Sequence, residues 1–143
     1  DIADVPQAAA DYFAEHGMAH RAAIAPALAS LDGTGTEITT AIDANQEVSI
    51  TLADGGIAET GSLIFRSSPD TPMLHNYLGL HHIAVLRRES VARYLEEAFA
   101  GAEDDAMPRI LSLVTGTSGT ADIEAVNIRG AHGPRYLHIV VVG

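Results

Sequence analysis

The chain has 143 residues, of which 19 are acidic and eight are basic, and its formal net charge is −11. This charge excludes nucleic acids and anionic membranes as expected partners, because both are bound by clustered lysine and arginine. The chain contains no cysteine, which excludes disulfides, thiolate catalysis and an iron–sulfur cluster held by its own cysteines.

Length and hydrophobicity favour one domain over residues 1–143, because 143 residues suffice for an ordinary core and 47% of them are hydrophobic. No apolar run approaches the roughly 20 residues that span a bilayer. The acidic N-terminus does not resemble a signal peptide, so we expect a cytoplasmic protein. Because the first residue is Asp rather than Met, we also expect the sequence to be a fragment of a longer protein.

The first third of the chain is predicted to be largely helical. Apolar residues recur at helical spacing over residues 5–18, and Gly17 suits the end of that helix. The alanine-rich segment 20–30 predicts a second helix, which Pro26 breaks. Residues 37–44 are compatible with either a short helix or an edge strand.

The middle of the chain combines predicted strands with one helix. Segment 47–53 alternates apolar and polar residues, as a strand or a short helix would, and Asp54-Gly55 is a turn signal. Residues 62–65 predict a strand, and residues 82–86 predict a buried one. Segment 89–99 carries apolar residues at helical spacing and predicts a helix.

Two apolar runs near the end of the chain complete the predicted fold. Residues 110–114 predict a strand, and the nearly continuous run 137–142 is typical of a strand covered on both faces. Strands that alternate with helices indicate an α/β fold, with a mainly parallel sheet flanked by helices. In such sheets ligands bind at the carboxyl ends of strands, which places the turn after strand 110–114 at a candidate site.

That turn, residues 116–124, is rich in glycine, serine and threonine. Gly116 and Gly119 permit positive φ angles, so that backbone N–H groups can turn toward one point. Ser118 or Thr120 would cap a short helix that follows, and the free amides at a helix start attract an anion. The alternative is a capped helix with no ligand, which the same residues support about equally.

Three sets of polar residues form the candidate site: the corner at Glu59, the turn at 116–124 and His132. Glu59 stands beside small residues and is either a nucleophile or general base, or a turn carboxylate. His132 is either a structural tether for the glycine-rich turn or an acid or base that titrates near neutral pH. The expected ligand-binding residues accompany them: Thr60, Gly61, Gly116, Ser118, Gly119, Thr120, Asp122 and Glu124.

Histidines do not form a recognisable metal motif. His81 and His82 are neighbours on a predicted strand and therefore point to opposite faces. His16 and His20 have helical spacing, but Gly17 lies between them near the expected helix end. We therefore predict no metal and no cofactor on this chain.

Three segments of the sequence resemble the lactate-utilisation protein C family, or LUD domain. They are G-I-A-E-T-G-S-L at 56–63, T-G-T-S-G-T-A-D-I-E at 115–124, and G-A-H-G-P at 130–134, which L-H-I follows at 137–139. The resemblance implies a fold similar to that of CoA transferases and ribose-5-phosphate isomerase, with a Rossmann-like α/β sheet. It also implies a role in oxidising L-lactate to pyruvate together with iron–sulfur partner proteins.

Two hypotheses follow from the residues and the resemblance. In the first, the chain is an accessory component of lactate oxidation that binds a small anionic ligand or a partner at residues 116–124. In the second, it is a stand-alone enzyme that handles acyl groups or phosphosugars, as CoA transferases and isomerases do, with Glu59 as nucleophile or base. We favour the first, because Arg129 and Arg135 are the only cations near the site in sequence.

Overall fold

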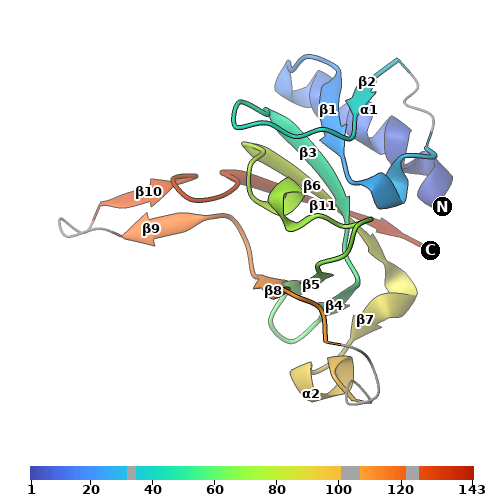
Figure 1. Cartoon of the computed structure of the whole chain (residues 1–143), viewed down its shortest axis with the longest axis vertical. Coiled ribbons are helices and arrows are strands. Elements are labelled where there is room, and N and C mark those ends of the chain that lie inside the picture. Colours follow the sequence, from blue (N-terminus) through green and yellow to red (C-terminus); the bar gives the residue numbers. More distant parts are fainter. Residues whose placement is uncertain (32–34, 101–106, 122–125) are drawn as a thin grey trace.

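A five-stranded parallel sheet forms the centre of the molecule in the computed structural model, which describes residues 1–31, 35–100, 107–121 and 126–143 (Figure 1). Its strand order is β11-β6-β3-β1-β2, and every neighbouring pair is parallel. This confirms the predicted α/β fold with a parallel sheet. The strands are β1 (Arg21–Ile24), β2 (Glu37–Thr39), β3 (Val48–Leu52), β6 (His81–Arg87) and β11 (Tyr136–Val142).

Helix α1 (Val5–His16) packs against one face of this sheet, as the apolar spacing of residues 5–18 predicts. Phe13 of α1 is fully buried and belongs to the same core as Ile50 of β3 and Ile83 of β6. The helix ends at Gly17, whose φ of 62° is the left-handed conformation that glycine adopts without steric cost.

The opposite face of the parallel sheet packs against a second sheet, of order β7-β4-β5-β8. Phe65 of β5 joins Ala84 and Leu86 of β6 in the core between the two sheets. The prediction of a sheet flanked by helices is therefore wrong for this face, which strands cover. The elements of this layer are β4 (Gly55–Ile57), β5 (Ser62–Arg66), β7 (Val91–Ala92), β8 (Leu111–Val114) and the four-residue helix α2 (Leu95–Ala98).

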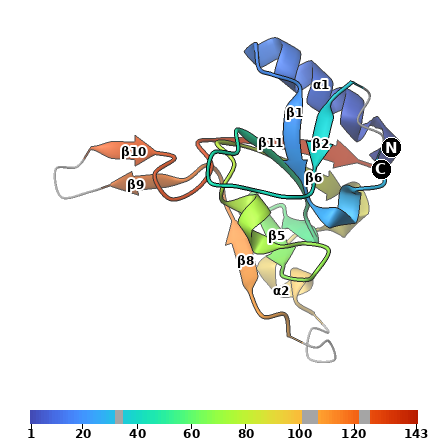
Figure 2. The same ribbon diagram turned by 45° about the horizontal axis from the view of Figure 1, so that its top comes forward.

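An antiparallel ribbon extends away from both sheets in the two views of Figures 1 and 2. It consists of β9 (Gly119–Ala121) and β10 (Asn127–Arg129), with Thr120 directly opposite Ile128. Short 3₁₀ helices at Ile2–Asp4, Pro26–Leu28, Met73–Asn76 and Arg88–Ser90 complete the secondary structure of the described ranges.

The alanine-rich segment 20–30 corrects one prediction, since it contains strand β1 and a 3₁₀ turn instead of a broken helix. Ala22 and Ala23 are fully buried, and β1 pairs with β2 on one side and β3 on the other. Alanine has the highest helix propensity of all residues, but propensity is a weak determinant that tertiary context overrides, so burial between two partner strands decides the conformation here. Segments 37–44 and 47–53, for which the sequence allowed a helix or a strand, contain strands β2 and β3.

The predicted helix at 89–99 is also corrected, since only Leu95–Ala98 of it is α-helical, whereas the predicted turn at 54–55 corresponds to a bend at Asp54 between β3 and β4. Gly55 begins β4, which pairs with β5 and with β7. A Cβ on Gly55 would lie 2.9 Å from the carbonyl oxygen of Ser90, so only glycine admits this close approach. The apolar side chain of Val91 therefore pairs with β4, opposite Gly56, instead of starting a helix.

Strand β11 forms where the sequence predicts it, but it is an edge strand and is not covered on both faces. Ile139 and Val141 are 40% and 51% exposed, whereas Val142 is buried against the core on the α1 side. A run of β-branched residues identifies a strand but does not determine its place in a sheet.

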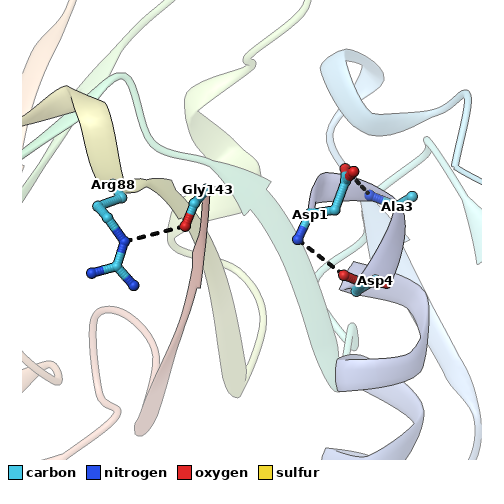
Figure 3. A network of polar contacts seen from close by, with 5 residues as sticks. All are labelled: Asp1, Ala3, Asp4, Arg88 and Gly143. Atoms are coloured by element: carbon cyan, nitrogen blue, oxygen red, sulfur yellow. Dashed lines mark hydrogen bonds and ion pairs between the residues drawn. The ribbon is translucent and has the colours of Figure 1, made fainter.

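Short polar contacts involve the first and last residues of the chain (Figure 3). The side chain of Asp1 accepts a hydrogen bond from the amide of Ala3, and its amino group lies 2.9 Å from the carboxylate of Asp4. Arg88 donates a hydrogen bond from Nε to the carbonyl oxygen of Gly143.

Candidate functional site

A cavity of about 280 Å³ lies where the two sheets meet the β8–β9 connection. His82 and Leu137, which line it, are the second residues of β6 and β11, so the cavity adjoins the amino ends of these parallel strands. The expected position at the carboxyl ends is therefore wrong, because β8 belongs to the second sheet. The lining residues are Asn76, Tyr77, His82, Ser112 to Ser118, His132 to Pro134 and Leu137.

The glycine-rich turn and the loop around His132 form one wall of this cavity together. The amide of Ser118 donates a 2.9 Å hydrogen bond to the carbonyl of Pro134, and the amide of Gly130 donates one to the carbonyl of Ser118. Gly133 packs so closely that a Cβ there would lie 3.2 Å from that of Ser118. The two segments that the sequence suggested as neighbours therefore meet, and main-chain bonds provide the tether.

The helix predicted after Gly119 is absent from the described part of this segment. Residues 119–121 form β9, which pairs with β10, and neither Gly119 nor Thr120 is among the cavity residues. Asp122 and Glu124 lie outside the described residues. Because the Ser118 amide already has a carbonyl partner, anion binding at a helix start gains no support from this turn.

The corner of residues 59–61 connects β4 with β5 and does not line the cavity. A chain of hydroxyls nevertheless joins the two places. Thr60 Oγ1 lies 2.7 Å from Ser62 Oγ, which lies 2.6 Å from Thr115 Oγ1 in the cavity wall. The side chain of Glu59 is exposed, and its amide donates to the carbonyl of Arg93.

His82 and Asn76 contribute buried polar groups to the cavity, and the sequence did not suggest them as ligand-binding residues. His82 is 1% exposed, and its Nε2 shares a 2.7 Å hydrogen bond with Thr51 Oγ1. Burial lowers the pKa of His82 to about 4, so the imidazole is neutral at physiological pH. The only feature of the sequence that could have indicated His82 was a histidine at the start of an apolar strand.

Tyr77 and His132 separate this cavity from a second, more open one. The hydroxyls of Tyr77 and Ser112 share a hydrogen bond. The second cavity, of about 640 Å³, shares Tyr77, His132 and Gly133 with the first and extends past Glu47. The exposed imidazole of His132 therefore borders both spaces, which leaves it available to a ligand in either one.

The first cavity has no lysine or arginine in its lining, as far as the described residues define it. Its polar groups are hydroxyls, main-chain groups, one amide side chain and the imidazoles of His82 and His132. Hydrogen bonds from such neutral groups are weaker toward anions than an arginine clamp is. This lining suits a small ligand of low charge better than a phosphate ester.

Four other histidines, His16, His20, His81 and His138, lie against Tyr12 or Phe13 of α1. His81 Nδ1 is 2.8 Å from the hydroxyl of Tyr12, which confirms that His81 and His82 face opposite sides. Burial lowers the pKa of His81, and the nearby His16 acts in the same direction. Across the described ranges, no three His, Cys, Asp or Glu side chains form a group that could hold a metal ion.

Fold and cavity together define the class: an α/β protein with a parallel sheet and a small, uncharged polar cavity at one end of it. The model of the LUD domain family matches residues 13–142, and the chain therefore belongs to this family. This confirms the resemblance seen in residues 56–63, 115–124 and 130–134.

Two relatives illustrate the match. An uncharacterized protein of Neisseria meningitidis serogroup B is 33% identical over 137 residues, which cover 90% of this chain and 57% of that protein. Lactate utilization protein C of Deinococcus radiodurans is 36% identical over 93 residues, which cover 61% of this chain and 42% of that protein. The chain thus spans about half the length of these relatives.

A solved structure shows the same fold. The crystal structure of a DUF162 family protein from Deinococcus radiodurans superposes with a TM-score of 0.66 and 22% identity, over 99% of this chain and 84% of that one. Among the described residues, no helix combines the length and apolar character needed to cross a bilayer.

Proposed function

We propose that this chain is a component of L-lactate utilisation that binds a small anionic ligand in the cavity between the glycine-rich turn and His82. The relationship to lactate utilization protein C supports the process. The cavity supports the binding role, because about 280 Å³ and an uncharged polar lining suit a three-carbon acid. In this proposal, contacts to the ligand come from the turn at Gly116 to Ser118 and from His132.

Redox chemistry belongs to partner proteins in this proposal. Oxidation of lactate to pyruvate removes two electrons and two protons from the carbinol group, and iron–sulfur clusters on the partners accept the electrons. This sequence contains no cysteine that could hold such a cluster, because it contains no cysteine at all. The contribution of this chain is to bind and orient the acid, either as substrate or as product.

Ligand binding can be tested by thermal shift with lactate, pyruvate, phosphosugars, CoA and nucleotides. A ligand at one hundred times its dissociation constant stabilises the folded state by about 2.7 kcal/mol. We expect the two three-carbon acids to raise the melting temperature, and phosphosugars to leave it unchanged. Lactate oxidation by the purified chain alone, with an acceptor dye, would contradict the accessory role.

The alternative function is an acyl- or phosphosugar-handling enzyme with the fold of CoA transferases, in which Glu59 is the nucleophile or base. The hydroxyl chain from Thr60 through Ser62 to Thr115 favours it, because it connects the Glu59 corner with the cavity wall. Substitution Glu59→Gln would abolish turnover in this case and leave the fold intact. Turnover that survives this substitution removes Glu59 from the mechanism.

A further inference from the structure

We propose that His82 and Asn76 form the polar floor of the cavity and bind a hydroxyl group of the ligand, so that the site selects a hydroxy acid over the corresponding deoxy acid. The inference rests on the proposed function, since it assigns the part of the ligand that enters deepest. It adds two binding residues that neither the sequence motifs nor the family relationship indicated.

Both side chains are almost completely buried and carry a polar atom that lacks a partner. His82 is 1% exposed and Asn76 is 3% exposed. Neither Nδ1 of His82 nor Oδ1 of Asn76 has a hydrogen-bond partner among the residues that the structure describes. Buried polar atoms are nearly always paired in folded proteins, so two such atoms on residues that line one cavity point to a group that binds there.

Location in the cavity distinguishes these two residues from other buried polar groups. Ser49 Oγ and His75 Nδ1 also lack partners within the described ranges, but neither residue lines the cavity. Ser49 is the residue opposite His82 in the β3–β6 pairing, so it offers a control in nearly the same environment. An unpaired buried atom alone does not make a site, whereas one in a cavity wall can meet a ligand.

The chemistry of the two atoms selects a hydroxyl. Asn76 Oδ1 only accepts hydrogen bonds, because it is a carbonyl oxygen. The nitrogen of the same side chain donates to Met73 Sδ at 3.7 Å. In the proposed site the Thr51 hydroxyl donates to Nε2, so the neutral ring of His82 carries its proton on Nδ1, which is the free position and a donor. A hydroxyl donates one hydrogen bond and accepts another, whereas a carboxylate only accepts and would leave Asn76 Oδ1 unpaired.

This arrangement divides the ligand between two parts of the cavity. The carbinol group lies against His82 and Asn76, and the carboxylate remains near the turn at Gly116 to Ser118 and His132, which is exposed to solvent. Buried groups that lose their partner discriminate strongly against an analogue without the hydroxyl.

Three small probes test the inference on the intact chain: L-lactate, propionate, which lacks the 2-hydroxyl, and 1,2-propanediol, which lacks the carboxylate. Imidazole ¹⁵N resonances are followed by NMR, and Thr51→Val identifies those of His82 by removing its Nε2 partner. We expect L-lactate and 1,2-propanediol to shift the His82 Nδ1 resonance. L-lactate should bind roughly 10- to 100-fold more tightly than propionate, because the hydroxyl makes two hydrogen bonds in the proposed site.

Substitution Asn76→Leu should remove the preference for lactate over propionate, whereas Ser49→Ala should keep it. Equal affinities for the two acids, or an unmoved His82 signal, overturn the hydroxyl assignment and leave the small-anion proposal standing. A response to 1,2-propanediol alone supports the hydroxyl assignment and contradicts the small-anion proposal. No response to any probe overturns both.

Discussion

The hydrogen bond between Thr51 and His82 is expected to be a main polar contribution to the stability of the core. Both residues are buried, at 3% and 1% exposure, and the two atoms lie 2.7 Å apart. Substitution Thr51→Val keeps the shape of the side chain but leaves His82 Nε2 without a partner. An unsatisfied buried group costs about 1–3 kcal/mol, so we expect the free energy of unfolding to fall by that amount.

Urea unfolding at pH 7 measures this change, provided that the slopes of the two transitions agree. The matched control is Ser49→Ala, because Ser49 lies on the same strand, is fully buried and has a hydroxyl without a described partner. Its removal deletes an unsatisfied group and should change stability by less than about 0.5 kcal/mol. Equal losses for Thr51→Val and Ser49→Ala would refute the assigned role of the Thr51–His82 bond.

Three further predictions concern pH and close packing. The pKa of His82 falls from 6.5 to about 4 on folding, so the unfolded chain takes up the proton first. The contribution of His82 to the free energy of unfolding is therefore fully present above about pH 6.5, and the free energy falls by about 3 kcal/mol toward pH 4. Urea unfolding measured over this pH range should show a smaller decrease for His82→Gln. Substitution Gly133→Ala should cost about 1 kcal/mol by thermal unfolding, because the new Cβ meets Ser118 at 3.2 Å, and a second change Ser118→Gly should recover it. Substitution Gly55→Ala should destabilise more than Gly56→Ala in the same assay, since the first Cβ meets a backbone oxygen at 2.9 Å and the second meets the flexible Leu86 side chain at 3.2 Å.

Local sequence patterns correctly predicted the elements whose apolar residues match the faces that are buried in the structure. Helix α1 has one apolar face, and its glycine terminator is in the expected left-handed conformation. Strand β6 has an apolar run that is buried on both faces, with Ile83 toward α1 and Ala84 toward the second sheet. In both cases the periodicity of the side chains and the final environment agree, so sequence alone was sufficient.

Long-range pairing decided the elements that the sequence did not predict. Segment 20–30 has helical composition, yet Ala22 and Ala23 fill narrow space on the two faces of a central strand. Segment 89–99 has helical spacing, yet Val91 pairs with Gly56 of β4. Neither partner is visible from the residues themselves, because the pairing joins segments that are distant along the chain.

The candidate site divides in the same way. The sequence brought residues 116–118 and His132 together, and both segments do line one cavity. It missed His82 and Asn76, because an isolated histidine or asparagine in an apolar context carries no motif. Their importance depends on which atoms lack partners and on what space they face, and these properties exist only in the folded chain.

The position of β8 explains why hydrogen bonding, and not charge, is expected to determine ligand choice. If β8 belonged to the parallel sheet, the turn after it would lie at the carboxyl edge and lead into a helix whose dipole attracts anions. Strand β8 instead pairs with β5 in the second sheet, and the turn leads into β9 beside the amino end of β6. There the turn meets His82, which burial keeps neutral, within a chain of net charge −11. A multiply charged anion gains little in this setting, whereas a small acid with a hydroxyl can satisfy buried groups that otherwise remain unpaired.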